Sequence, residues 1–364
     1  MNELVLVTGA NGFVGRHLVR ELLQGRYQVR AVDRSFENAP EDGAERIEAD
    51  ILDAPIMQAA MDDVKTVYHL AALTSLWMPD ESAYQTVNVE GTRTVLQAAL
   101  DAKADRFVHC SSFVTAITGS ASRNERSVAD DDIGEPADLF GAYARSKRRG
   151  ERVVMDAKFL IDTIVVMPSA PIGAGDHNMT APTGLLRDLV NGNIPATLDQ
   201  LINFIDVQLL AKAIVQAGEQ GQPANRYLLS GKNWRMDDFL VHLEQLTGID
   251  MPKRQVPFSL ALIASFVEEK ILCKLMKRPP KAPFSGVRFA GRKLVFDATK
   301  AQASFDMDLT PLDDALIEAL SWLSKNGHLN RAIPAFDEFK EETGQEADHE
   351  TQQENGDTPS QAQE

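Results

Sequence analysis

One tyrosine and one lysine in the sequence have the spacing of a proton-transfer pair. The stretch GAYARSKRRGE at 141–151 places Lys147 four residues after Tyr143, and no other tyrosine of the chain has a lysine at that offset. Residues i and i+4 share one face of a helix. A free phenol has a pKa near ~10 and is a poor acid or base at neutral pH, but a nearby ammonium favours the phenolate and lowers that pKa. The pair can therefore exchange a proton with a hydroxyl group.

This chemistry needs a third group to hold the oxygen of the reacting carbonyl. Ser111 and Ser112, at the end of the apolar run RFVHCSS (106–112), are the two candidates. A tyrosine acquires such a lysine by chance about once in twenty cases at average composition. Taken alone, the pair could therefore simply be part of an ordinary helix surface. The sequence upstream must decide between this alternative and a proton-transfer pair.

A glycine-rich loop lies between the first apolar run and the first helical pattern. In TGANGFVG (8–15) the glycines follow GxxGxxG rather than the common GxGxxG spacing. Gly9 permits a tight turn, Gly12 lets the backbone approach a pyrophosphate, and Gly15 lets the helix pack closely. The phosphates would then face a helix N-terminus. The predicted cofactor-binding residues of the loop are Gly9, Asn11, Gly12, Phe13, Val14 and Gly15, and an ordinary glycine-rich turn is the alternative.

The second strand-like run ends at a carboxylate that could bind a ribose. Asp33 would accept hydrogen bonds from both adenosine ribose hydroxyls and repel a 2′-phosphate, which favours NAD. Arg34 beside it could instead accommodate NADP. Asp50 and Ile51 are expected beside the adenine. The small residues of HLAA let the cofactor lie against a strand end, and the predicted contacts there are Leu70, Ala71 and Ala72. With bound nicotinamide, Tyr143 and Lys147 would move the proton while hydride is transferred, and the lysine would also hold the ribose.

The elements that must position these residues alternate between strands and helices. This rhythm predicts an α/β fold with a doubly wound parallel sheet. Strands are expected at 4–9, 27–33, 44–50, 66–72, 106–112, 160–169 and 226–230, and helices at 12–24, 54–61, 82–102, from Tyr143 onward, and 236–248. We expect a nucleotide-binding domain at 1–169 and a smaller α/β substrate lobe at 170–330 that partly returns to the sheet.

These motifs together resemble the extended short-chain dehydrogenase/reductase family, within the NAD-dependent epimerase/dehydratase superfamily, over about residues 3–325. They are TGANGFVG, DILD (50–53), HLAA (69–72), NVEGT (88–92), CSS (110–112), YARSK (143–147) and PSAPIGAGD (168–176). The resemblance implies a Rossmann sheet with a C-terminal substrate lobe and a catalytic serine, tyrosine and lysine.

The resemblance also assigns individual roles. The place of the serine in RFVHCSSFVT points to Ser112, with Ser111 second. Asn88 would order the active-site helix, and Pro168 and Ser169 would begin the loop that flanks the nicotinamide. The region from 29 to 64 is similar to 3β-hydroxysteroid dehydrogenases, whereas 168–196 looks more like the dihydroflavonol-reductase and hopanoid-associated branches.

Composition excludes several classes of function. The chain of 364 residues has a net charge of −16, and 337–364 holds ten acidic residues and one lysine. That tail has too few apolar residues to fold and is expected to be disordered. An acidic body argues against nucleic acid as a partner. Two cysteines give no disulfide framework, and no export signal or membrane span is visible, so a cytoplasmic protein is expected. The histidines lack metal-ligand spacing, and we propose no metal.

The segment 256–281 combines an apolar run at helical spacing with a basic end. Between Lys270 and Lys293 there are eight basic residues and no acidic ones. Such a helix can rest on anionic lipid at the inner face of a membrane, or it can simply pack on the substrate lobe. With the steroid-type resemblance, the segment favours a lipid-like ketone or alcohol as substrate: a sterol, a hopanoid, or a 3-oxo-sphingolipid as in a bacterial ceramide reductase.

Three functions remain open. The first is an NAD(P)-dependent oxidoreductase acting on such a substrate. The second is a sugar-nucleotide epimerase or dehydratase with tightly bound NAD, which would use the same tyrosine and lysine. The third is a cofactor-binding assembly or sensor protein without turnover, although such chains often lack one of these two residues. Members of the family are often dimers, so a homodimer is an expectation from the resemblance alone.

Overall fold

The structure is a computed structural model that describes residues 3–37, 39, 43–117, 125–273, 278–307 and 312–334. The tail at 337–364, predicted to be disordered, lies outside the described residues. Within the described residues, no helix combines the length and the apolar composition needed to cross a membrane.

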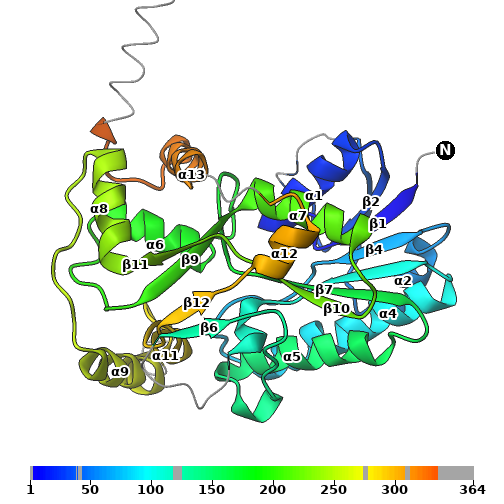
Figure 1. The fold of residues 1–364 in the computed structure, drawn as a ribbon, viewed down its shortest axis with the longest axis horizontal. Coiled ribbons are helices and arrows are strands. Elements are labelled where there is room, and N and C mark those ends of the chain that lie inside the picture. The colour runs from blue at the N-terminus through cyan, green and yellow to red at the C-terminus, as the bar shows by residue number, and fades with distance from the viewer. Residues whose placement is uncertain are drawn as a thin grey trace, which may run out of the picture.

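Seven parallel strands form the main sheet, in the order β10-β7-β5-β4-β1-β2-β3 (Figure 1). Their bounds are β1 (Leu4–Thr8), β2 (Gln28–Asp33), β3 (Glu45–Glu48), β4 (Thr66–His69), β5 (Arg106–Cys110), β7 (Asp162–Pro168) and β10 (Asn225–Leu229). The inner strands are nearly continuous apolar runs because helices cover both of their faces. The order reverses between β1 and β4, and ligands bind at such a switch point in open α/β sheets.

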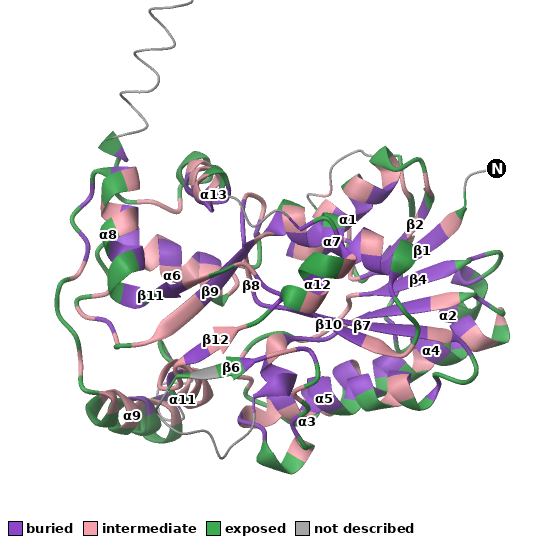
Figure 2. Ribbon diagram, viewed as in Figure 1, coloured by how far each residue is buried: buried purple, intermediate pink, exposed green. Residues whose placement is uncertain are grey.

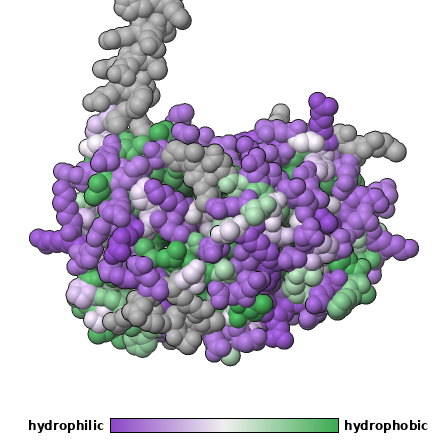
Figure 3. Space-filling view, in the orientation of Figure 1, coloured by the Kyte–Doolittle hydropathy of each residue, from purple (hydrophilic) through white to green (hydrophobic). Residues whose placement is uncertain are grey.

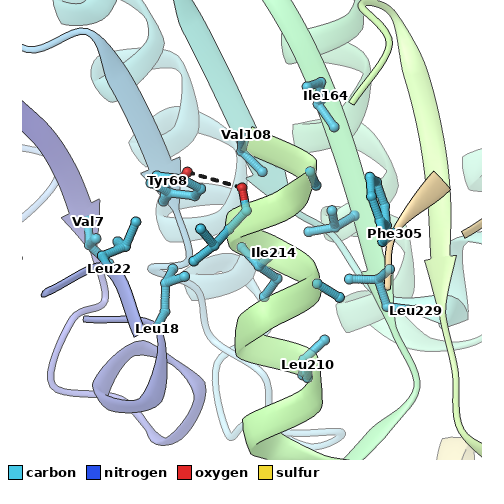
Figure 4. Packing of buried hydrophobic residues seen from close by; sticks show 14 of the residues in the cluster. Val7, Leu18, Leu22, Tyr68, Val108, Ile164, Leu210, Ile214, Leu229 and Phe305 are labelled. Atoms are coloured by element: carbon cyan, nitrogen blue, oxygen red, sulfur yellow. Dashed lines mark hydrogen bonds between the residues drawn. The ribbon is translucent and has the colours of Figure 1, made fainter. Parts of the chain in front are cut away.

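Helices cover both faces of the main sheet (Figure 1). On one face α1 (Phe13–Gln24), α7 (Val207–Gln220) and α12 (Thr299–Ser304) share a core with β1 and β7. Figure 4 shows Leu18 and Leu22 of α1 beside Leu210 and Ile214 of α7 in this core. On the other face lie α2 (Ala54–Ala60), α4 (Thr92–Asp101) and α5 (Gly141–Asp156).

The helix predicted over 82–102 is not a regular α-helix throughout. It consists of α3 (Ser82–Gln85), a π-helical turn η1 (Thr86–Gly91) and α4. Gly150 of α5 presses on the π turn, because a Cβ at Gly150 would lie 2.3 Å from the backbone oxygen of Asn88. Single π turns inside helices often occur at functional sites, and the hydrophobic periodicity of the sequence does not reveal them.

A smaller lobe adds two further sheets. One contains β8 (Ala170–Ile172), β9 (Leu201–Asp206) and β11 (Lys232–Arg235), and the other pairs β6 (Arg126–Val128) with β12 (Leu294–Phe296). The helices of this lobe are α6 (Ala181–Val190), α8 (Met236–Thr247), α9 (Phe258–Val267), η4 (Glu268–Leu272), α11 (Phe284–Ala290) and α13 (Asp313–Lys325), and two short 3-10 turns, η2 (Phe113–Ala116) and η3 (Pro136–Asp138), precede α5.

The predicted fold, a doubly wound parallel sheet with a smaller C-terminal lobe, is confirmed. Both β10 and α7 fall between 170 and 330 but complete the main sheet and its cover, which is the predicted partial return. The division of the chain at 169 and 170 stays a prediction.

Candidate active site

The predicted site residues lie at the carboxyl ends of the parallel strands. The glycine loop follows β1, Asp33 ends β2, Leu70 follows β4, and Ser111 follows β5. Because parallel strands end at the same edge of a sheet, these residues share one edge, beside the switch point.

The glycine loop has the tight geometry that its spacing predicts. Gly9 has a φ of 69°, and a Cβ there would lie 2.7 Å from the backbone nitrogen of Ala71. A Cβ at Gly15 would lie 2.0 Å from the carbonyl oxygen of Gly9, so α1 begins in direct contact with the turn. Gly12 is the N-cap of α1, with no side-chain cap and no acidic residue in the first turn. The helix N-terminus, where Phe13 and Val14 lie, is thus left for an anion such as a pyrophosphate.

Asp33 fastens the end of β2 to the glycine loop. One carboxylate oxygen accepts from the backbone N–H of Asn11 at 2.9 Å and the other from that of Arg34 at 2.7 Å. The amide of Asn11 donates to the carbonyl oxygens of Ser35 and Glu37 at 2.9 and 3.1 Å. Asp33 thereby lies beside the glycine loop, as a ribose-binding carboxylate must, whereas the Arg34 side chain is exposed.

A cavity of about 220 Å³ opens next to this junction. It is lined by Asn11, Phe13, Arg16, Ser35, Glu37, Gly175, His177 and Asn178. Arg16 was not singled out from the sequence; its guanidinium donates to the carbonyl oxygens of Asn11 and Glu37 at 3.0 and 3.2 Å. Gly175 and His177 bring the loop after β8 to the same cavity, so the smaller lobe closes it.

The residues expected beside the adenine differ in exposure. Asp50 is exposed, and its carboxylate accepts from the backbone N–H of Leu52 at 2.9 Å. The side chain of Ile51 is buried in the core, where a Cβ at Gly91 would lie 2.5 Å from its Cδ1. Only its backbone could therefore face a cofactor.

The predicted contacts at the ends of β4 and β7 are partly or fully buried. Leu70, Ala71 and Ala72 directly follow β4 and are half-buried. Pro168 ends β7, and the backbone N–H of Ser169 donates to the carbonyl oxygen of Leu229 at 2.9 Å. The Ser169 hydroxyl is buried and has no hydrogen-bond partner within the described part of the chain. Their contacts with a cofactor stay predictions.

Tyr143 and Ser112 are brought together. Tyr143 lies in the first turn of α5 and is buried, which raises its pKa to about 12, while the nearby Ser112 side chain acts to lower that pKa. Ser112 is the N-cap of the short 3-10 turn η2 that follows β5. At neutral pH the phenol therefore keeps its proton in this arrangement.

Lys147 lies one turn further along the same helix and is buried as well. Its ammonium donates to the carbonyl oxygen of Cys110 at 2.7 Å, at the end of β5. Burial lowers the pKa of Lys147, and the nearby Cys110 and Glu151 act in the opposite direction. Lys147 thus contacts Cys110, and Tyr143 lies beside Ser112. Both side chains of α5 therefore reach the end of β5, on either side of Ser111 in the sequence.

The two candidate serines have different environments. The hydroxyl of Ser111 donates to the carboxylate of Glu151 at 2.9 Å inside the core, whereas the side chain of Ser112 lies close enough to the Tyr143 phenol to lower its pKa. These environments favour Ser112 as the partner of the phenol and give Ser111 a structural contact, while the catalytic role of Ser112 stays a prediction.

Asn88 joins the loop after β4 to α5. Its amide oxygen accepts from the backbone N–H of Leu73 at 2.7 Å, and its nitrogen donates to the Leu73 carbonyl at 3.0 Å and to the Ser146 hydroxyl at 2.9 Å. Ser146 in turn donates to the carbonyl oxygen of Tyr143 at 2.8 Å. Asn88 is thus well placed to order the active-site helix, while its predicted contact with the cofactor stays a prediction.

Glu151 is a component of the site that the sequence reasoning missed. Its side chain is fully buried and lies between two arginines, with Arg148 at 3.1 Å and Arg226 of β10 at 2.7 Å. The spacing carried a usable signal, since Tyr143, Lys147 and Glu151 follow one another at intervals of four on one face of α5. A buried carboxylate needs partners of opposite charge, and the partner from β10 lies 75 residues away in sequence, a contact that no local pattern indicates.

The residues present fit a dinucleotide with a nicotinamide ring. Glycines leave space at the uncapped start of α1, a carboxylate ends β2, and a phenol, a hydroxyl and an ammonium lie around the end of β5. Such a set can bind pyrophosphate and ribose and can move a proton at a substrate oxygen.

Comparisons with known proteins agree with this geometry. A profile of the NAD dependent epimerase/dehydratase family matches residues 5–229. A putative dihydroflavonol 4-reductase from Synechocystis sp. is 34% identical, over 90% of this chain and 97% of its own length. Sterol demethylase protein B from Methylococcus capsulatus is 27% identical, over 88% of this chain and 98% of its own.

Among solved structures, the crystal structure of gox2253 is 28% identical and superposes with a TM-score of 0.78, covering 90% of this chain and all of the other. MoeE5 in complex with UDP-glucose and NAD has 20% identity and a TM-score of 0.68, over 88% and 99% of the two chains, and shares the fold. The profile match spans more than half of the chain, and the first relative covers nearly all of it. The chain belongs to the NAD dependent epimerase/dehydratase family.

Proposed function

We propose that the chain is an NAD(P)-dependent oxidoreductase that interconverts a ketone and a secondary alcohol on an apolar, lipid-like substrate. The observation that carries the proposal is the buried phenol of Tyr143, which lies among apolar side chains and close enough to the Ser112 side chain for that serine to affect its pKa. A neutral phenol beside a serine hydroxyl can hold a carbonyl oxygen and give it a proton.

Each of the three catalytic residues would have one task. Ser112 donates a hydrogen bond to the substrate oxygen, and Tyr143 gives that oxygen its proton during reduction or accepts it during oxidation. Lys147, held at the carbonyl oxygen of Cys110, keeps a positive charge one helical turn from the phenol. Bound NAD(P) would supply or accept the hydride.

We propose NAD as the preferred cofactor. The negative charge of Asp33 beside the glycine loop disfavours a 2′-phosphate. The exposed Arg34 and the guanidinium of Arg16 beside the cavity are the features that could accommodate NADP. Tighter binding of NADH than of NADPH, measured by titration of the purified protein, is the expected result.

The surroundings of Tyr143 support an apolar substrate. The buried cluster around the phenol includes Tyr84 and Leu139, and the partly buried side chains that pack against this cluster are Leu73, Leu76, Met78, Phe113, Ala142 and Phe289. A diphosphate sugar would need cations and hydrogen-bond donors in such a place. One relative over nearly the whole chain is named for sterols. Sterols, hopanoids and 3-oxo-sphingolipids, the last as for a ceramide reductase, are the substrate types we propose.

A sugar-nucleotide epimerase is the second candidate, because solved structures with this fold include UDP-glucuronic acid 4-epimerase from Bacillus cereus. The two functions differ in what happens to the cofactor. An epimerase retains NAD through purification and shows no net turnover of it, whereas a reductase consumes NAD(P)H with its substrate.

The test is a panel of ketones offered with NADH or NADPH: a 3-oxo-sphingoid, a 3-oxo-steroid, a flavanone and a keto sugar. We expect the absorbance of the reduced cofactor to fall with at least one of the first two, and the alcohol product to appear in equal amount. Turnover confined to the keto sugar, or NAD that co-purifies and stays oxidised, would contradict the proposal.

A further inference from the structure

One helix of the smaller lobe exposes apolar side chains to solvent. The apolar outer face, as we name it, consists of Leu260, Ile263, Val267, Ile271 and Leu272. Ile263 is 62% exposed, Leu260 58% and Ile271 56%. Figure 2 shows α9 as a largely exposed helix, and in Figure 3 hydrophobic residues gather at the lower left, where α9 lies in Figure 1. Soluble proteins rarely leave such a group of large apolar residues uncovered without a binding role.

In α9 the exposed residues are largely apolar, whereas the buried residue is polar. Its one buried residue is Ser265, whose hydroxyl donates to the carbonyl oxygen of Leu262 at 3.0 Å. The side toward α11 is fixed by close contacts, since Phe266 and Phe284 stack edge to face at 5.6 Å and Phe258 fills the space beside Gly291. The outward residues at 260, 263, 267 and 271 follow helical spacing and form one continuous face.

The acidic side chains of the segment are turned inward. Glu268 and Glu269 are the only acidic residues from 251 to 293, and their side chains are 17% and 12% exposed. Glu269 accepts from the backbone N–H of Phe284 at 2.8 Å and pairs with Lys270 at 3.0 Å. Glu268 pairs with Arg278 at 3.1 Å. Both carboxylates therefore stabilise the hairpin of α9 and α11 and leave the outer face without negative charge.

Basic residues are concentrated in the sequence on both sides of the apolar outer face. The sequence from 251 to 293 holds ten basic and two acidic residues, in a chain whose net charge is −16. Among the described residues, Lys253, Arg254, Lys270, Lys281 and Arg288 are exposed. An acidic protein is repelled by an anionic surface except where its charge is locally reversed. Apolar residues flanked by exposed basic residues, here called the basic rim, are the combination that binds the acyl boundary and the head groups of an anionic leaflet.

This face is connected to the candidate active site through α11. The α11 helix packs on α9, and the hydroxyl of Ser285 donates to the carbonyl oxygen of Leu76 at 3.0 Å. Phe289 of α11 packs against the apolar cluster that contains Tyr143, together with Leu76. A continuous series of apolar side chains thus leads from the exposed helix to the phenol.

We propose that the apolar outer face docks on an anionic lipid surface and that the substrate enters the site from that surface past α11. The route of the substrate rests on the proposed function, whereas the docking does not. A second copy of the chain is a less suitable occupant, because a two-fold contact would bring the basic rims of both copies together.

The test of docking is co-sedimentation of the full chain with vesicles of phosphatidylcholine alone or with about one third phosphatidylglycerol, since anionic lipid attracts a basic rim. The wild-type protein is expected to pellet with the anionic vesicles and to be released by high salt. The triple variant Leu260→Ser, Ile263→Ser, Ile271→Ser should bind at least about tenfold more weakly, because binding scales with the buried apolar area.

Two exposed apolar residues elsewhere provide a matched control. Phe159 is 87% exposed and Val241 58%, and neither lies near α9 in sequence. The double variant Phe159→Ser, Val241→Ser should pellet like wild type, and equal melting temperatures show that the variants fold. Docking is refuted if wild-type protein stays in the supernatant, or if the triple variant binds as well as wild type. It is also refuted if the triple variant only converts a dimer into a monomer.

Activity measurements distinguish the proposed route of the substrate from the proposed reaction. With a short-chain, water-soluble ketone, the triple variant should retain the wild-type rate; with the same ketone on a long-chain lipid in vesicles, its rate should fall about as much as its binding. If no ketone is reduced but docking is found, the proposed function fails and the docking stands. If both variants reduce the vesicle-bound lipid equally, the route is wrong and the proposed function stands.

Discussion

The change Glu151→Ala tests how α5 is held against the sheet. In the folded chain, Glu151 accepts a hydrogen bond from the Ser111 hydroxyl at 2.9 Å and lies 3.1 Å from Arg148 and 2.7 Å from Arg226. The exposed fractions of the three charged side chains are 0%, 9% and 5%. The alanine would leave two buried guanidinium groups without their carboxylate: Arg148 of α5, the helix that bears Tyr143, and Arg226 of β10, beside it.

The expected loss of stability follows from the burial of these charged groups. Removing one partner of a buried ion pair costs about 3–5 kcal/mol of unfolding free energy, because the remaining charge is uncompensated. A chain of 364 residues has an unfolding entropy of roughly 0.8 kcal/mol per kelvin. The melting temperature should therefore fall by about 4–7 °C.

The assay is thermal unfolding followed by circular dichroism, with Glu135→Ala as the control. Glu135 pairs at 3.7 Å with Arg152, which belongs to α5 like Glu151, but the side chains of Glu135 and Arg152 are 65% and 55% exposed. An exposed pair contributes about 0–1 kcal/mol, so the control should melt within about 1.5 °C of wild type. Glu151→Gln, which keeps hydrogen-bonding groups and loses the charge, should lie between the two variants. Equal melting temperatures for Glu151→Ala and Glu135→Ala would refute the reasoning.

Three further predictions concern the site itself. Ser112→Ala should lower kcat/KM by about 10²–10³ with little change in stability, whereas Ser111→Ala should mainly cost about 1–2 kcal/mol of stability by removing a buried hydrogen bond; the reverse pattern would exchange their roles. Gly15→Ala should abolish binding of NADH in a fluorescence titration, because its Cβ would lie 2.0 Å from the carbonyl oxygen of Gly9, and wild-type affinity would contradict the packing. Since burial raises the pKa of Tyr143 to about 12, the phenol stays protonated at neutral pH. Ketone reduction should then be nearly flat from about pH 6 to 9 while alcohol oxidation rises about tenfold per pH unit, and a steep loss of reduction across this range would count against the phenol as the acid.

The sequence predicted those parts of the fold and site that depend on local spacing. The apolar runs of β1 and β5 and the glycine turn between β1 and α1 are short-range patterns, and the structure has them where they were expected. The pairing of Tyr143 with Lys147 on one face of α5 is likewise a consequence of helical periodicity. The order of the strands follows from the rules of doubly wound sheets once the alternation is recognised.

Features that depend on distant contacts could not be predicted in this way. The hydroxyl of Ser111 donates to Glu151, so Ser112 is the serine beside Tyr143. The sequence alone left open which of the two serines would take this position. The π turn around Asn88 arises where α5 presses on it. The apolar residues of α9 have the spacing of a helix, but only the packed structure distinguishes the side that meets α11 from the side that meets solvent.

The most direct test of the central claim is the change Tyr143→Phe, which removes one oxygen from the buried cluster. Reduction of the best ketone should fall by at least about 10²-fold, because general acid catalysis contributes about 10²–10⁴-fold. The dissociation constant for NADH should change by less than about threefold, since the glycine loop and Asp33 are untouched. Turnover at the wild-type rate, with the cofactor still bound, would contradict the assignment of Tyr143 as the proton donor.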